Sequence, residues 1–181
     1  YFSSSDGKFN TRYEAERRFE ELRTGRAAVK GGWRIYSSGP GIYLNQLIAN
    51  WNVLYVKLHH YHWYVKGSDF FTLHAKFQEL YEEAALHIDE LAERLLALKG
   101  RPLSRMSDFL KISHVKEAEG GESAEDMVEQ LISDYTVMLR DLSGGMAAAQ
   151  EAGDEITADM LLSIKSSLEK HLWMLGAFLG K

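Results

Sequence analysis

The chain has 181 residues, which is enough for one domain with a substantial hydrophobic core. Its residues are 45% hydrophobic and 26% charged, an ordinary globular balance, and no apolar run reaches the roughly 18 residues that a membrane span needs. The absence of cysteine excludes disulfides, thiolate zinc sites and iron–sulfur clusters, so a bound metal must take His, Asp, Glu or water as ligands. We expect a cytoplasmic protein without membrane association, because the start of the chain lacks the basic-then-apolar order of a signal peptide.

Charge is unevenly distributed along the chain. Residues 1–40 hold eight Lys/Arg and five Asp/Glu, a net charge of +3, whereas residues 41–181 hold 13 and 21, a net charge of −8. We interpret residues 1–41 as a basic N-terminal extension, either a native tail or a segment foreign to the natural chain, and residues 42–181 as the folded body. An acidic body argues against nucleic-acid binding through its surface and favours the attraction of cations.

The first elements along the chain are a linker and two long helices. The run Ser38-Gly39-Pro40-Gly41 is typical of a linker. Apolar residues at spacings of three and four then predict an amphipathic helix over residues 44–65, ended by Gly67-Ser68-Asp69, and a second over residues 71–98, ended before Pro102.

Three more helices are expected after Pro102. Residues 106–112 suit a short helix. Ser123 resembles an N-cap with Asp126 in the capping-box position, so a third long helix should begin there. Gly144-Gly145 is a weak point within it, costing roughly 1 kcal/mol per Gly relative to Ala. A fourth long helix is expected over residues 155–178. The predicted fold is all-α: a four-helix bundle with a short extra helix between helices two and three.

Histidines and paired carboxylates suggest a metal site. Four of the seven histidines fall within sixteen residues, and Asp89 and Glu93 lie four apart, on one face of the second helix. Imidazole nitrogens with carboxylate oxygens suit iron, manganese or zinc. The alternative is a partly buried polar patch beside a solvated acidic face. The clustered histidines are His59, His60, His62 and His74.

Helix geometry favours a metal site shared between two chains. His74 and Asp89 are fifteen residues apart on one helix, or about 22 Å at 1.5 Å per residue, so they cannot bind one ion within a chain. His62 and His74, in contrast, flank the turn between the two helices. Two hairpins packed antiparallel about a two-fold axis would bring the His pair of one to the carboxylate pair of the other. The chain holds no Glu-x-x-His pair, the usual motif for a site inside a single bundle.

At these residues the chain resembles a known family. Residues 57–67 (KLHHYHWYVKG), 69–74 (DFFTLH) and 87–94 (HIDELAER) are similar to the signature of the Dps proteins, or mini-ferritins. Residues 153–161 and 169–174 resemble the Gram-positive branch of that family, and the similarity spans about residues 42–181.

The resemblance implies a ferritin-like bundle and an iron-storing function. It implies ferroxidase ligands at His62 and His74 of one subunit and Asp89 and Glu93 of its two-fold partner, holding one or two iron ions. It also implies a dodecamer built from such dimers, in which Fe(II) is oxidised, commonly by hydrogen peroxide, and stored as ferric mineral, so that DNA is protected from oxidative damage.

The sequence also suggests roles for several residues near the predicted site. Gln78 stands where some relatives have an acid four residues after the second His, which weakens or alters a second iron position. Trp63 is expected to serve packing more than chemistry. We interpret His171 as a packing residue near the end of the fourth helix, and the other histidines as surface or interface residues, namely His59, His60, His87 and His114.

Two further predictions concern iron passage and DNA. Asp154, Glu155 and Asp159 match the position where relatives line a three-fold pore, although acids in a first helical turn are also favoured by the helix dipole alone. The basic tail, with Lys30-Gly31-Gly32-Trp33-Arg34, is a candidate for DNA binding. The alternative function is therefore a nucleoid-compacting DNA-binding protein in which iron oxidation is secondary.

Overall fold

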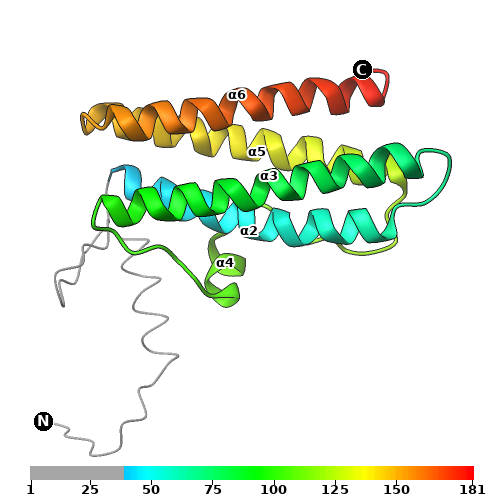
Figure 1. Cartoon of the computed structure of the whole chain (residues 1–181), viewed down its shortest axis with the longest axis horizontal. Coiled ribbons are helices and arrows are strands. Elements are labelled where there is room, and N and C mark those ends of the chain that lie inside the picture. The colour runs from blue at the N-terminus through cyan, green and yellow to red at the C-terminus, as the bar shows by residue number, and fades with distance from the viewer. Residues whose placement is uncertain (1–38) are drawn as a thin grey trace, which may run out of the picture.

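The structure is a computed structural model that describes residues 39–181. Four long helices form an antiparallel bundle and a short helix lies against its side (Figure 1). The described part of the chain contains no strand. The helices are α2 (Pro40–Tyr64), α3 (Phe70–Ala97), α4 (Met106–Ile112), α5 (Ala124–Glu151) and α6 (Glu155–Phe178). The all-α prediction is confirmed. Residues 1–38 of the N-terminal extension, with the candidate DNA-binding residues, lie outside the described part of the chain.

The helix ends follow local sequence signals. The Ser123 hydroxyl accepts a hydrogen bond from the Asp126 backbone N–H, and the Asp126 side chain accepts one from the Ser123 backbone, so the predicted capping box is confirmed. The linker interpretation is wrong from Pro40 onward, because Pro40 is the first residue of α2. The proline ring presets φ near its helical value, and the first turn of a helix does not use the N–H that proline lacks.

The core runs along the whole bundle. Each long helix contributes fully buried apolar side chains at helical spacing, such as Leu54, Phe77, Leu131 and Leu168. A buried ion pair crosses it: Lys57 Nζ lies 2.7 Å from Asp134 Oδ2 and joins α2 to α5. Among the described residues, no helix is both long and apolar enough to cross a membrane.

Helix order places the candidate residues at opposite ends of the bundle. Helices α2 and α3 form one hairpin, and α5 and α6 form the other (Figure 1). The turn between α2 and α3 lies at one end, and the start of α6 lies at the other, beside the end of α3. His62 and His74 therefore lie far from the N-terminus of α6.

Candidate metal centre

His62 and His74 meet at the turn between α2 and α3. The turn is short, and Gly67 adopts a φ of 99°, a left-handed conformation that glycine tolerates best. The two imidazole rings stack with centroids 3.7 Å apart and planes inclined by 20°. The expectation that the turn brings these two histidines together is confirmed.

Reciprocal hydrogen bonds fix how the two rings are protonated. His62 Nδ1 lies 2.7 Å from the His74 carbonyl oxygen, and His74 Nδ1 lies 2.8 Å from the His62 carbonyl oxygen. A carbonyl only accepts, so each Nδ1 carries the hydrogen and donates it. In the neutral ring the Nε2 lone pair is then free, and Nε2 of neither ring is a buried atom or has a hydrogen-bond partner among the described residues. This is the arrangement that prepares histidine for a metal.

Aromatic side chains pack around the pair. The Tyr81 ring meets His62 edge-on at 5.4 Å and stacks on His59 at 3.9 Å, while Phe70 stacks on His74 at 4.9 Å. These contacts restrict the orientations of both imidazoles. Trp63 was expected to pack, but within a single chain it is 67% exposed and contacts only the edge of this group, at His59.

The predicted carboxylate ligands lie on the other half of α3. Asp89 and Glu93 are exposed and make no hydrogen bond or ion pair within the described part of the chain. Across residues 39–181, no three His, Asp or Glu side chains are grouped closely enough to hold a metal ion. One chain thus presents a histidine pair and a carboxylate pair that do not meet.

The three predicted pore residues differ in their surroundings. Glu155 and Asp159 are exposed on the first turns of α6. Asp154 is the N-cap of α6, where its carboxylate accepts a hydrogen bond from the Thr157 backbone N–H at 3.1 Å and pairs with Arg94 Nη2 at 2.5 Å. The charge of Asp154 is thus compensated by Arg94, whereas Glu155 and Asp159 have no hydrogen-bond or ion-pair partner for their side chains within residues 39–181. Whether the three acids line a pore remains a prediction.

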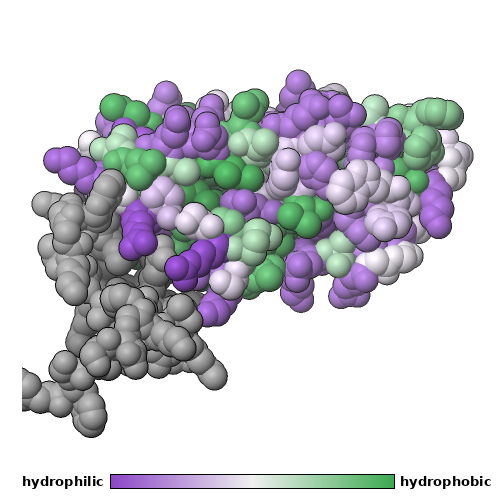
Figure 2. Space-filling view, turned by 60° about the horizontal axis from the view of Figure 1, so that its bottom comes forward, coloured by the Kyte–Doolittle hydropathy of each residue, from purple (hydrophilic) through white to green (hydrophobic). Residues whose placement is uncertain are grey.

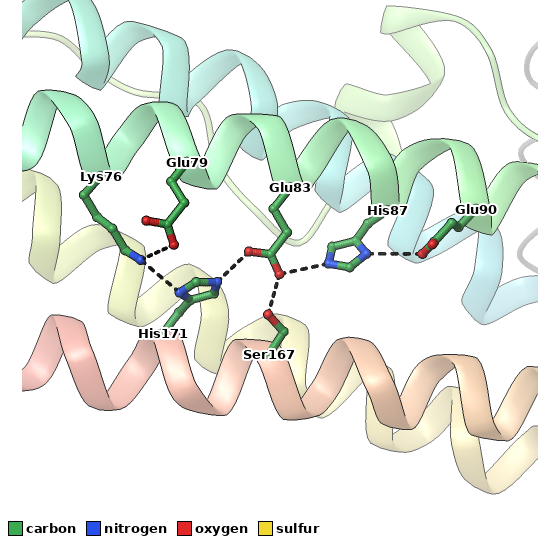
Figure 3. A network of polar contacts seen from close by, with 7 residues as sticks. All are labelled: Lys76, Glu79, Glu83, His87, Glu90, Ser167 and His171. Carbon is green, nitrogen blue, oxygen red and sulfur yellow. Dashed lines mark hydrogen bonds and ion pairs between the residues drawn. The ribbon is translucent and has the colours of Figure 1, made fainter.

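A polar network between α3 and α6 was not predicted (Figure 3). Glu83 lies at its centre. Its carboxylate accepts hydrogen bonds from His171 Nε2 at 2.6 Å, from His87 Nε2 at 3.2 Å and from the Ser167 hydroxyl. Lys76 Nζ, which can only donate, lies 3.4 Å from His171 Nδ1, so the His171 hydrogen is on Nε2.

Charge and burial set the ionisation of this network. Burial alone would raise the pKa of the Glu83 carboxyl, but its three hydrogen bonds outweigh burial and hold the pKa well below its ordinary value. His171 is buried, as expected of a packing residue, but it also donates to Glu83. His87 was expected at the surface or at an interface; its side chain is largely buried within the chain, where its ring lies 4.8 Å from the Trp51 ring and its Nε2 contacts Glu83. The sequence signal for this contact was the spacing of four residues between Glu83 and His87, which places both on one face of a helix.

Comparison with known proteins places the chain in a family. The ferritin-like domain profile matches residues 43–181. The chain is 58% identical over 137 residues to General stress protein 20U of Bacillus subtilis, covering 76% of this chain and 94% of the relative. The chain belongs to the Dps family. It is also 56% identical over 138 residues to DNA protection during starvation protein 2 of Bacillus anthracis, with coverage of 76% and 94%.

Solved Dps structures share the fold. The Dps of Staphylococcus aureus superposes with a TM-score of 0.75 at 49% identity, covering 76% of this chain and 92% of that one. The Dps of Bacillus brevis gives 0.76 at 51% identity, covering 77% and 94%. The suspected resemblance to Gram-positive Dps proteins and the ferritin-like architecture are thereby confirmed.

Proposed function

We propose that this Dps protein stores and detoxifies iron by oxidising Fe(II) at sites shared between two subunits. The main support for this proposal is the reciprocal hydrogen bonding of His62 and His74, which leaves both Nε2 lone pairs free at one end of the hairpin. Two imidazoles form half of a metal site. Asp89 and Glu93, exposed and unpaired within the described residues, have the chemistry of the other half.

A second subunit is required by distance. The helical rise keeps His74 and Asp89 of one chain about 22 Å apart. A two-fold dimer with antiparallel hairpins supplies each histidine pair with the partner's carboxylates and makes two equivalent sites. Large exposed apolar side chains also favour assembly, because a lone chain rarely leaves such groups in water. They include Trp63, Phe71 and Trp173, at 67%, 84% and 71% exposure.

The residues divide the chemistry between them. His62 and His74 bind the iron substrate through neutral nitrogen, and Asp89 and Glu93 supply the negative charge that favours the ferric product. Two Fe(II) ions give one electron each to hydrogen peroxide, which takes up two protons and becomes two water molecules. Because both electrons are delivered together, no hydroxyl radical is released. The ferric product accumulates as mineral inside a shell of twelve subunits, and DNA is spared oxidative damage.

Iron reaches the interior through a three-fold channel. Glu155 and Asp159 are exposed at the start of α6, and a ring of their carboxylates from three subunits would concentrate cations and speed their arrival.

Crystals soaked in ferrous salt test the location of the site. Anomalous scattering at the iron edge should show a peak bounded by His62 and His74 of one subunit and by the partner's Asp89 and Glu93. A peak contacted by one subunit alone would contradict the shared site, and iron found only elsewhere would contradict the ligand assignment.

A mixing experiment tests sharing without crystals. A chain carrying His62→Ala and His74→Ala is refolded together with a chain carrying Asp89→Ala and Glu93→Ala. A homodimer of either variant has no complete site. A mixed dimer has one site with all four ligands and one site with none. Co-refolded protein should therefore oxidise Fe(II) while each variant alone does not. Failure to restore activity, with mixed dimers demonstrated by mass spectrometry, would refute sharing.

A further inference from the structure

His60 and Glu122 present two buried polar atoms that face each other without a hydrogen bond. His60 Nε2 lies 3.7 Å from Glu122 Oε2, which is too long for a hydrogen bond and amounts to an ion pair only if the imidazole is protonated. Water does not reach either atom, and neither has a hydrogen-bond partner within residues 39–181. Buried polar atoms without partners are rare because they are costly. The pair therefore suggests a ligand that bonds to both atoms at once.

The pair lies at the end of the bundle where α2 ends and α5 begins. His60 is in the last turns of α2, and Glu122 is in the loop that precedes α5. In Figure 1 the connection from α4 to α5 runs to this end of the bundle. His62, two residues further along α2, is rotated by about 200° around the helix axis and bonds to α3. The pair is therefore separate from the candidate iron site.

Glu122 is held as an ionised group with one oxygen to spare. Its side chain is only 6% exposed, and Oε1 accepts a hydrogen bond from the Glu119 backbone N–H at 2.9 Å. Burial would raise the pKa of this carboxyl, but hydrogen bonds from the backbone N–H groups of residues 119, 120 and 122 outweigh burial and hold the pKa below its ordinary value. Oε1 thus orients the carboxylate, while Oε2 is left for a cation.

An acidic cleft of about 410 Å³ lies beside Glu122. Four carboxylates line it, and no Lys or Arg of the described residues does. Lys181 pairs with one of the four, Glu129, at 2.9 Å. At the right-hand end of the molecule, Figure 2 shows hydrophilic and near-neutral surface beside an apolar patch. A cleft lined by one sign of charge raises the local concentration of cations. The carboxylates are those of Glu119, Glu122, Asp126 and Glu129.

The chemistry of the two buried atoms favours a transition-metal ion. Imidazole nitrogen with carboxylate oxygen suits zinc and similar divalent ions, whereas calcium and magnesium prefer oxygen alone. An ion bonded to both atoms at about 2.1 Å would subtend roughly 120° across the 3.7 Å gap, near the tetrahedral value. Because no third His, Asp or Glu of residues 39–181 is close enough to join them, water from the cleft fills the remaining positions.

We propose that His60 Nε2 and Glu122 Oε2 bind a divalent transition-metal ion of the Zn(II) class, which arrives through the acidic cleft. The ion links the end of α2 to the loop before α5, two segments that are distant in the chain. It stabilises the folded state by its binding free energy. It takes no part in Fe(II) oxidation, because the candidate iron site uses neither residue.

A zinc soak of wild-type crystals tests the two ligands directly. Anomalous scattering on both sides of the zinc edge should give a peak within about 2.2 Å of His60 Nε2 and of Glu122 Oε2. A peak that touches only the cleft carboxylates, or no peak beside His60, would overturn the proposal. Because the two sites share no ligand, failure of the candidate iron site leaves this expectation unchanged.

Calorimetric titration with Zn(II) tests the site in solution. The full chain carries His62→Ala and His74→Ala, which remove the competing histidine pair. His60→Gln or Glu122→Gln in this background should weaken Zn(II) binding at least about tenfold, since loss even of a contact that supports a ligand costs that much.

Two matched controls are made in the same background. His114→Gln removes an exposed histidine elsewhere, and Glu125→Gln removes an exposed acid from the first turn of α5, so each control changes the same residue type as one test variant. Both controls should leave Zn(II) affinity unchanged. Equal weakening by Glu125→Gln would show attraction by net charge alone and would overturn the proposal.

Unchanged affinity in both test variants would mean that His60 and Glu122 form a plain ion pair, which also overturns the proposal. Thermal unfolding gives an independent readout. Zn(II) should raise the Tm of the background chain and raise it less after His60→Gln or Glu122→Gln. An equal rise in all chains would contradict the site. The crystal soak uses the wild-type chain, so a variant that fails to fold does not remove the test.

Discussion

Tyr43 of α2 packs directly over Gly145 of α5. A Cβ atom added to Gly145 would lie 3.0 Å from Tyr43 Cβ and 2.9 Å from Leu161 Cδ1. The absence of a side chain at Gly145 therefore allows α2, α5 and α6 to approach one another closely.

This contact predicts that Gly145→Ala destabilises the protein although alanine is the better helix former. Crowding of a packed core costs about 1–3 kcal/mol, which exceeds the roughly 1 kcal/mol gained in helix propensity. Gly176→Ala in α6 is the control, because its Cβ would have no neighbour within 4 Å, so it should stabilise. Urea unfolding of both variants measures the difference. A stabilising Gly145→Ala would refute the packing argument.

Loss of a metal-binding imidazole should impair Fe(II) oxidation selectively. His62→Ala or His74→Ala should slow oxidation at least about tenfold, since loss even of a supporting contact to a ligand costs that much. With no zinc added, His60→Ala is the control, because His60 lies on the same helix as His62 and its ring contacts and ion pair are to Tyr61, Tyr64 and Glu122, outside the aromatic group around the histidine pair. Stopped-flow ferric absorbance measures the rate, and unchanged sedimentation shows that the oligomer remains intact. Equal slowing by His60→Ala would point to helix disruption.

The Glu83 network should make stability depend on pH. Because its folded-state pKa is depressed, ionised Glu83 stabilises the native state above the unfolded value near pH 4.3. That contribution is lost as pH falls through the folded-state pKa. Glu83→Gln should cost roughly 1–3 kcal/mol at neutral pH, because it disrupts buried hydrogen bonds. Urea midpoints across a pH series should show the gap shrinking in acid. A gap independent of pH would exclude an ionised Glu83.

Asp159→Asn should slow mineral growth at low ionic strength, with a deficit that shrinks as salt rises. The Debye length falls from roughly 10 Å at 0.1 M to about 3 Å at 1 M salt, so steering by carboxylates is screened. Glu169→Gln, an exposed acid ten residues further along α6, is the matched control. Stopped-flow uptake across a salt series gives the comparison. A deficit of equal size at every salt concentration would indicate a structural role for Asp159.

Helix positions were predictable because local signals determine them. The capping box at Ser123 and the apolar spacing of α6 depend on residues within a few turns, and both were predicted correctly. The interpretation of Pro40 as a linker residue was wrong, because proline occurs both in linkers and in the first turn of a helix, and its neighbours decide which. Gly145 appeared to be a defect because its partner, Tyr43, is about a hundred residues away in the chain.

The candidate site was predictable where a short turn determines it. His62 and His74 flank the turn from α2 to α3, so their meeting follows from the chain order alone. Glu83 and His171 meet across helices that are far apart in sequence, and no spacing rule relates them. Whether Asp89 and Glu93 complete a site depends on a second chain and remains a prediction.

The polar seam of Glu83, His87, Ser167 and His171 also determines the register of α6 along α3. Apolar ridges allow a helix to slide by one turn, about 5.4 Å, into an equivalent groove. A slide here would separate Glu83 from His171 and leave a buried carboxylate unpaired, which is far more costly than lost apolar contact. The network therefore fixes one register of α6 along α3. Because Glu155 and Asp159 lie in the first turns of α6, the register of α6 also determines their distance from Asp89 and Glu93 on α3.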